Sequence, residues 1–314
     1  MRVIRHLERG AVPPADVVLT LGNFDGVHVG HAAIIRRARA EATARGAALV
    51  VLTFHPHPAT VLAPAKAPAR LQALHERLVC VAGLGVDVAV VQRFTPAFAH
   101  LEAEDFVREY LCRWLCVRHV VVGHRVSFGR GRVGSAALLE RLGASLGFTV
   151  ESLGPVQVDG EEVSSTSVRT AVSAADMARA ARLLGRAYGL RGRVVTGDRL
   201  GHTIGFPTAN LHVPGGVLLP PDGVYAAWTE VAGTRHRVAL NIGVRPTFAG
   251  RRRTVEAYLL DFDGDLYGAW LRLELVARLR GEERFADIAA LKRAIARDVA
   301  QARAVLDAAP AGRA

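Results

Sequence analysis

Apolar and polar positions along the first half of the chain predict strands and helices in turn. Continuous apolar runs, typical of strands covered on both faces, occur at 17–21, 47–54, 86–91, 117–123 and 148–153. Stretches with helical spacing lie between them, at 32–46, 70–85, 101–115 and 135–147. This alternation predicts an α/β fold with a doubly wound, largely parallel sheet, whose ligands bind at the carboxyl ends of the strands.

The periodicity changes in the second half, after a helical stretch at 174–185 and a short link at 186–190. Short strand-like runs separated by glycine and proline turns follow one another without helices, at 194–195, 224–228, 236–240, 254–260 and 270–279. They predict a small antiparallel barrel, followed by a last helix at about 287–308. We therefore expect two domains, residues 1–185 and residues 186–314.

The composition of the chain bears on whether it binds nucleic acids or membranes. The net charge of +11 raises the question of nucleic-acid binding, but the aromatic content is only 6% and no stacking platform is interleaved with the arginines. The N-terminus lacks the apolar stretch of a signal peptide, and no apolar segment reaches the roughly 18 residues of a membrane span. We expect a cytoplasmic protein without nucleic-acid or membrane partners, and self-association is left open.

The three cysteines form no C-x-x-C pair. Cys112 and Cys116 are four positions apart in a stretch predicted to be helical, which would place both thiols on one buried face. Core packing is therefore the interpretation we favour for them over metal or redox chemistry.

The turn between the first strand and the first helix reads Gly-Asn-Phe-Asp-Gly-Val-His-Val-Gly-His. Its glycines, Gly22, Gly26 and Gly30, permit close backbone approach, and a helix that starts here presents unpaired N–H groups to an anion. His28 and His31 are three apart, so both imidazoles can donate hydrogen bonds to one polyphosphate. The turn predicts a site of phosphoryl or nucleotidyl transfer; for the short His-x-Gly-His pattern alone, a glycine-rich turn with two surface histidines is an equal alternative.

A run of hydroxyl side chains precedes another helical stretch. Ser164, Ser165 and Thr166 can cap the helix and can also bind phosphate oxygens, and Arg169, one turn later, can reach the same anion.

A second glycine-rich segment lies at the start of the predicted barrel. Gly197, Gly201 and Gly205 recur every four residues, a spacing that lets a loop fold over phosphates through its N–H groups. Thr208 and Asn210 follow and offer two hard oxygen ligands suited to Mg²⁺ bound to a nucleotide.

These motifs resemble known families. The first turn, with Phe24 and Asp25, is similar to the signature of the HxGH nucleotidyltransferase superfamily and to the flavin adenylyltransferase module of bacterial bifunctional riboflavin kinase/FMN adenylyltransferases. The second segment resembles the riboflavin kinase motif ending in Gly-Phe-Pro-Thr-Ala-Asn, although His202-Thr203-Ile204 departs from the commoner Arg-x-Leu. The resemblance covers about 17–299.

The resemblance implies an enzyme that phosphorylates riboflavin to FMN and adenylylates FMN to FAD, with ATP as co-substrate and Mg²⁺ as cofactor. Its small-molecule partners are riboflavin, FMN, FAD and ATP. The implied catalytic residues are Glu256, His28, His31 and Arg169. The implied ATP- and phosphate-binding residues are Gly22, Phe24, Asp25, Gly26, Gly30, Ser164, Ser165, Thr166, Gly197, Gly201, Gly205, Thr208 and Asn210, and Thr208 and Asn210 are also the implied metal ligands. The expected flavin-binding residues are Phe54, His57, Arg125, Phe128 and Arg284.

One segment departs from the family pattern. In 122–134, Arg125 replaces the usual Asp or Asn and Val126 replaces the usual Phe, so a long cation and a branched aliphatic stand near the expected flavin site. The alternative is therefore a riboflavin kinase whose N-terminal domain is weakened or altered in substrate. Extra phosphate binding by Arg125 is a milder interpretation.

Overall fold

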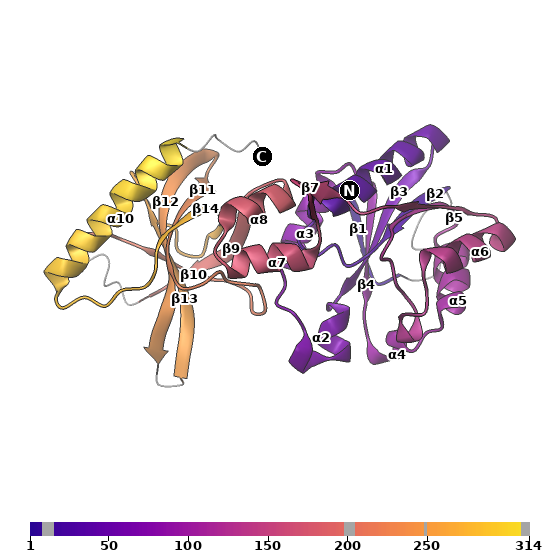
Figure 1. Cartoon of the computed structure of the whole chain (residues 1–314), viewed down its shortest axis with the longest axis horizontal. Coiled ribbons are helices and arrows are strands. Elements are labelled where there is room, and N and C mark those ends of the chain that lie inside the picture. Colours follow the sequence, from indigo (N-terminus) through magenta and orange to yellow (C-terminus); the bar gives the residue numbers. More distant parts are fainter. Residues whose placement is uncertain (8–15, 198–204, 248–249, 309–314) are drawn as a thin grey trace. The chain divides into compact units, whose positions relative to one another are not determined.

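The computed structural model of the chain describes residues 1–7, 16–197, 205–247 and 250–308 (Figure 1). The chain forms two compact units, and each is built from two stretches of sequence. The first unit holds Met1–Ala69 and Leu74–Ser164, and the second holds Arg70–Ala73 and Ser165–Ala314.

The first unit is organised around a six-stranded sheet in which every pair of neighbours is parallel. In spatial order its strands are β1 (Arg2–Arg5), β4 (Val88–Arg93), β3 (Ala48–His55), β2 (Val17–Leu21), β5 (Val117–Gly123) and β6 (Thr149–Leu153). The order reverses at β2, whose neighbours are β3 on one side and β5 on the other. The crevice at such a reversal is where ligands bind in doubly wound sheets, so the turn after β2 occupies the expected position.

Helices and turns connect these strands. In chain order they are α1 (Val29–Arg45), α2 (Pro58–Leu62), η1 (Pro64–Lys66), α3 (Leu74–Ala82), α4 (Pro96–Ala99), α5 (Ala103–Asp105), the π-helix η2 (Phe106–Trp114), η3 (Arg130–Arg132) and α6 (Ala136–Leu146). A two-stranded hairpin, β7 (Gln157–Val158) and β8 (Glu161–Glu162), ends the unit.

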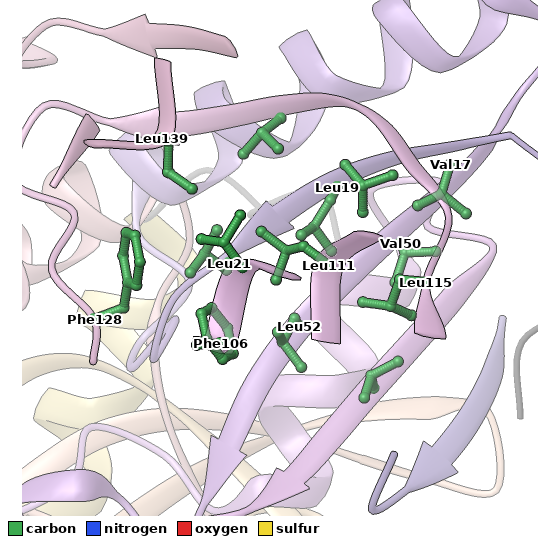
Figure 2. Packing of buried hydrophobic residues seen from close by; sticks show 14 of the residues in the cluster. Val17, Leu19, Leu21, Val50, Leu52, Phe106, Leu111, Leu115, Phe128 and Leu139 are labelled. Carbon is green, nitrogen blue, oxygen red and sulfur yellow. The ribbon is translucent and has the colours of Figure 1, made fainter. Parts of the chain in front are cut away.

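The central strands are buried on both faces, as their continuous apolar runs predict. On one face Leu19 of β2 and Leu52 of β3 pack with Phe106 and Leu111 of η2 and with Leu139 of α6 (Figure 2). On the other face, strand residues of alternate register, among them Val18 and Val51, pack with Ile35 of α1. Side chains successive along a strand point to opposite faces, so one strand supplies both cores.

The predicted helix at 101–115 is corrected by the structure. It is divided into α5 and the π-helix η2, and it ends before Cys116, which has a left-handed backbone (φ 51°). As a result Cys116 is exposed and Cys112 only half-buried, so the two thiols do not share a buried face. The first turn of the predicted helix at 70–85 is also absent, because α3 begins at Leu74.

The second unit contains the closed antiparallel barrel that the short strands predict. Its strands, in order around the barrel, are β10 (Ala209–His212), β13 (Gly250–Leu259), β12 (Thr234–Thr247), β11 (Gly223–Val231), β14 (Trp270–Arg280) and β9 (Tyr188–Val195), and β9 closes the barrel on β10.

Among its described residues, the barrel unit contains the helices α7 (Ser165–Ser173), α8 (Met177–Leu184) and α10 (Ile288–Ala308). Helix α10 lies along the outside of the barrel, where Ala302 and Leu306 pack on Ala226 and Ala239 (Figure 1). None of the helices among the described residues is long and apolar enough to cross a membrane.

The short segment Arg70–Ala73 also packs with the barrel unit, although it lies between β3 and α3 in the sequence. The Arg70 N–H donates to the Gly216 carbonyl at 2.8 Å, and the Arg70 carbonyl accepts from the Leu218 N–H at 2.8 Å. Arg186 Nη2 donates to Gln72 Oε1 at 3.2 Å. We call Arg70–Ala73 the strap.

Candidate active sites

The turn after β2 is compact and largely buried. Asp25 and His28 are 4% and 6% exposed, and the Phe24 ring is buried beneath them in the core of the first unit. Gly26 has a φ of 88°, a conformation that a residue with a Cβ rarely adopts. A Cβ on Gly30 would lie 3.2 Å from the His28 ring, so glycine at this position leaves room for that imidazole.

His28 caps the N-terminus of α1. Its Nδ1 accepts a hydrogen bond from the His31 N–H at 3.3 Å. In the neutral imidazole the proton therefore sits on Nε2, which becomes a donor. The His28 and His31 rings are stacked, with centroids 3.6 Å apart. Because the first turn of α1 holds no acidic residue, the helix N-terminus and the two rings together favour an anion.

The end of β3 and the loop that follows it carry two predicted flavin-site residues. Phe54 is 9% exposed, and its ring lies among Phe94 and Phe98, each 5.9 Å away between centroids. His57 caps α2, and its Nδ1 accepts from the Ala59 N–H at 3.2 Å. Both side chains thus shape this loop from within.

The segment after β5 carries the residues that depart from the family pattern. Phe128 is 7% exposed and packs against Phe106, with centroids 5.5 Å apart, while Val126 packs at the edge of the same core. The Arg125 side chain is 68% exposed, and its Nη2 donates to Glu162 Oε2 of β8 at 2.9 Å. An ion pair within the first unit is therefore the contact that the structure gives to Arg125.

The hydroxyl-rich segment spans the boundary between the units. Ser164 ends the first unit, while Ser165, Thr166 and Arg169 lie in α7 of the second. Ser165 and Arg169 are half-buried and Thr166 is exposed. We describe them within their own unit, and their approach to His28 and His31 stays a prediction.

Two residues that were assigned no role from the sequence connect β3 and the turn after β2 at the first site. Arg77 of α3 donates from Nη1 to the Asn23 carbonyl at 2.5 Å and from Nη2 to the Phe54 carbonyl at 3.2 Å. The Thr53 hydroxyl also donates to the Asn23 carbonyl, at 3.3 Å. Arg77 sits in a helix of mixed composition, and only the three-dimensional contact of α3 with both loops reveals it.

The second site lies on the outer surface of the barrel. Val255, Ala257 and Leu259 of β13 are buried, so Glu256 between them points outward. Glu256 is paired in register with Asn210 of β10 on one side and with Asn241 of β12 on the other. The Thr254 hydroxyl donates to Glu256 Oε1 at 3.2 Å. A carboxylate flanked by two amides therefore forms the centre of this surface.

The glycine-rich segment borders that surface. A Cβ on Gly197 would lie 2.3 Å from Asn210 Nδ2, so glycine is what allows the Asn210 side chain to occupy its position. Gly205 has a φ of 89°, and the half-buried Thr208 immediately precedes β10. Gly201 and the departing residues at 202–204 lie outside the described residues.

The chain after β14 brings a second carboxylate to the same surface. Glu282 Oε1 accepts from the Val244 N–H at 3.3 Å, and a Cβ on Gly243 would lie 2.2 Å from that oxygen. Arg280, which leads into this turn, forms a two-pronged bond with the buried Asp298 of α10. Neither Asn241 nor Glu282 was assigned a role from the sequence. Arg284 is exposed.

The donor set of the barrel surface suits Mg²⁺ carried by a nucleotide. Thr208 and Asn210 offer neutral oxygens, and Mg²⁺ in such sites takes most of its ligands from phosphates and water. Among the described ranges no group of three or more His, Cys, Asp or Glu side chains is arranged to hold a metal by itself. The residues thus fit a nucleotide-bound ion rather than an all-protein site.

Comparison with known families divides the chain in two. Residues 12–167 match the family described as FAD synthetase, and residues 184–306 match riboflavin kinase. The chain is similar to the bifunctional riboflavin kinase/FMN adenylyltransferase of Escherichia coli K12, with 42% identity over 96% of this chain and 97% of that protein. The enzyme of the same name from Bacillus subtilis is 37% identical over 92% of each chain.

A solved structure shares the whole architecture. A protein from Streptococcus pneumoniae, described as a macrolide-efflux protein, superposes with a TM-score of 0.87 at 29% identity. The match covers 96% of this chain and 99% of that one. The fold of both units is therefore found together in another protein.

Proposed function

Because the chain belongs to the bifunctional riboflavin kinase/FMN adenylyltransferase family, we propose that it makes FAD in two ATP-dependent steps at separate sites. It has both a FAD synthetase domain and a riboflavin kinase domain. The observation that carries the proposal is the match to relatives named for both activities over nearly the full chain. We assign adenylyl transfer to residues 1–185 and riboflavin phosphorylation to residues 186–314, a division supported by the two matched ranges.

In the kinase step, Glu256 is the general base. It accepts the proton of the ribityl 5′-hydroxyl while that oxygen attacks the γ-phosphorus of ATP, so that FMN forms and ADP leaves. The flanking Asn210 and Asn241 support this role, because they can orient the carboxylate and the substrate on one surface. Gly197, Gly201 and Gly205 would approach the phosphates.

In the adenylyl transfer step, the FMN phosphate attacks the α-phosphorus of ATP directly. The new P–O bond gives FAD, and pyrophosphate leaves. His28 Nε2 and His31 donate to the triphosphate and stabilise the charge that develops. Gly22, Phe24, Asp25, Gly26 and Gly30 shape the turn, and Ser164, Ser165, Thr166 and Arg169 bind the same phosphates.

Magnesium is the expected cofactor of the kinase site. Thr208 and Asn210 would hold the ion, which when bound neutralises charge on the phosphates of ATP. Chelation of Mg²⁺ with EDTA should stop FMN formation, and excess Mg²⁺ should restore it. FMN formation that persisted at full rate in EDTA would contradict this assignment.

The flavin contacts stay predictions. The burial of the Phe54 and Phe128 rings supports a role for them in the wall of the flavin pocket. His57 caps α2 and so stabilises the loop between β3 and α2. Arg284 lies on the exposed segment after Glu282. Arg125 pairs with Glu162, so a contact between Arg125 and a flavin phosphate would compete with that ion pair.

The kinase-only alternative rests on Arg125 and Val126. It is not favoured, because the FAD synthetase family matches the N-terminal half and the relatives are bifunctional. Restoring Asn at 125 and Phe at 126 should leave FAD synthesis at a similar rate. A large increase would revive the alternative.

The direct experiment is a time course. Purified protein is incubated with riboflavin, ATP and Mg²⁺, and riboflavin, FMN and FAD are separated by chromatography. We expect FMN first and FAD later. FMN that accumulates alone, even with added FMN and fresh ATP, would contradict the second step.

We place the enzyme in the cytoplasm because both steps consume ATP. Self-association stays open and can be measured by light scattering. We expect no binding to DNA or RNA; binding that weakens steeply with salt would contradict this.

A further inference from the structure

Arg77 is an arginine buried to an unusual degree. It lies on α3 with 6% exposure, and no motif includes it. A buried guanidinium is costly unless its N–H groups are hydrogen-bonded. Arg77 makes two such bonds, to the backbone carbonyls of Asn23 and Phe54.

One of these carbonyls lies in the histidine turn, and the other lies at the end of the strand that leads into the second loop of the first site. Asn23 lies in the turn that leads to His28, and Phe54 lies near the end of β3, just before His57. Strands β2 and β3 are parallel neighbours, so both loops leave the same edge of the sheet. A guanidinium is a planar, rigid fork, so one Arg77 side chain sets the separation of the two loops.

The Asn23 carbonyl is where the turn most needs support. The next residue, Phe24, has a φ of 48°, and Val27 has a φ of 39°, a left-handed conformation that is strained for a β-branched side chain. Such conformations persist when the surroundings over-determine them, and they cluster at functional sites. Arg77 and Thr53 both donate to this carbonyl, so the strained turn is held from α3 and from β3.

We propose that Arg77 is a positioning residue for adenylyl transfer: it fixes the distance between the histidine turn and the loop after β3. This inference rests on the proposed function of the first site. Arg77 acts through Asn23 and Phe54 rather than by touching substrate. Its loss should therefore impair the alignment of bound FMN and ATP more than the folding of the unit.

The test compares Arg77→Lys and Arg77→Met with Arg39→Met. Lysine keeps the positive charge but lacks the planar guanidinium that donates to both carbonyls at once, and methionine removes both hydrogen bonds. Arg39 is the matched control: it also donates to a backbone carbonyl, that of Gly85 at 2.9 Å, and it pairs with Asp87. Asp87 immediately precedes β4, so these contacts lie at the opposite edge of the sheet.

We expect kcat for FAD formation to fall about 10-fold in Arg77→Lys and about 100-fold in Arg77→Met, the scale of a misplacement of about 1 Å. The Kd for ATP, measured by calorimetry, should change less than threefold. FMN formation by the same molecules is the internal control and should be unchanged. Arg39→Met should retain wild-type kcat for both steps.

Equal losses in the Arg77 and Arg39 variants, or Arg77→Met with a kcat within twofold of wild type, would overturn the proposal. If Arg77→Met does not fold, the variants Arg77→Lys and Thr53→Val test the proposal instead. Each should lower kcat for FAD formation. The double variant should lower kcat by less than the product of the two single effects, because both side chains donate to one carbonyl. Independent effects would contradict the shared role. Failure of the proposed function itself is distinct, because the unaltered chain would then make no FAD.

Discussion

The proton positions and charges of single side chains determine which groups of the first site can donate hydrogen bonds to a phosphate. The His31 N–H holds His28 Nδ1, so the His28 proton is directed to Nε2, and the stacked His31 ring adds a second donor. In the barrel, Glu256 is the carboxylate between two amides. The two reactions should therefore respond to different single residues.

Replacing one residue in each unit should separate the two reactions. His31→Ala should reduce FAD formation by roughly 10²–10³-fold, the usual effect of losing a donor to a developing charge, and should leave FMN formation unchanged. Glu256→Gln should reduce FMN formation from riboflavin, and it should leave FAD formation unchanged when FMN is supplied. Chromatography of both products measures this. If either variant lost both activities while folded, the assignment to separate sites would be wrong.

His119 of β5 predicts a pH-dependent stability in the first unit. Its side chain is 6% exposed, and Nδ1 lies 2.7 Å from the Thr149 hydroxyl. Nε2 lies about 4 Å from Glu41 of α1 and Glu151 of β6. Burial lowers the pKa of His119, and Arg45 and Arg37 act in the same direction, while the two carboxylates raise it; the net pKa is lowered.

The sign follows from proton linkage. With a lowered folded-state pKa, the unfolded chain binds more protons between that value and about 6.5, so stability falls as the pH drops through this window. The slope is at most about 1.4 kcal/mol per pH unit. His119→Gln should flatten it in thermal unfolding measured from pH 5 to 8. The hydrogen bond from Arg45 holds the pKa of Glu41 below its ordinary value, so Glu41 titrates below the measured range of pH. An unchanged slope in the variant would exclude His119 as the cause.

At the scale of elements, the sequence predicts the sheet well and the irregular parts poorly. The apolar runs at 17–21 and 117–123 coincide with β2 and β5, because strands buried on both faces need continuous apolar residues. Strand β1 was missed: it has four residues, of which only Ile4 is buried. The π-helix and the exposure of Cys116 depend on a local left-handed residue that no periodicity indicates.

The candidate sites likewise contain residues that the sequence could indicate and residues that it could not. The turn 22–31 and the barrel segment could be proposed as sites from the sequence because their residue types are tied to short-range spacing. Arg77, Thr53 and Glu282 were missed because their contacts join segments distant in sequence and use backbone partners that any residue provides. Such contacts leave no pattern in a single sequence.

The attachment of helix α10 to the barrel can be tested through one buried ion pair. Arg280 bonds Asp298 through two 2.8 Å contacts, and Asp298 is 6% exposed. Removing one partner of a buried pair costs about 3–5 kcal/mol, so Asp298→Asn should destabilise the barrel unit towards the lower end of that range. Urea unfolding followed by the fluorescence of the barrel tryptophans measures it.

Asp307→Asn is the matched control on the same helix. Asp307 pairs with Arg237, but its side chain is 48% exposed, and exposed pairs are worth about 0–1 kcal/mol. If the two variants were equally stable, the Arg280–Asp298 pair would not be what attaches α10.

At the scale of the whole molecule, the strap makes the barrel unit discontinuous in sequence. Gln72 is 7% exposed and accepts from Arg186, and the Leu218 N–H donates to the Arg70 carbonyl. The exchange rate of the Leu218 amide therefore reports whether the strap is docked.

Gln72→Ala should accelerate exchange of the Leu218 amide by about 5–150-fold, because losing the part-buried hydrogen bond that Gln72 accepts from the half-buried Arg186 guanidinium costs about 1–3 kcal/mol. Hydrogen-exchange mass spectrometry measures it. Gln92→Ala is the control: Gln92 is a buried glutamine of the first unit that accepts from Leu7, and its loss should leave Leu218 unaffected. Unchanged exchange in Gln72→Ala would show that the bond between Gln72 and Arg186 does not hold the strap in place.

The strap also imposes an order on biosynthesis. A ribosome adds about 5–20 residues per second, and Gly215, whose carbonyl accepts from the Arg70 side chain, follows Arg70 by 145 residues. Between the emergence of the two, about 7–29 s pass in which Leu71, 1% exposed in the finished protein, has no barrel to cover it. The nascent chain therefore carries the strap, with Leu71 still outside the unit to which it belongs, until synthesis of the second unit is well advanced. This is the interval in which a chaperone would have a reason to bind the exposed leucine.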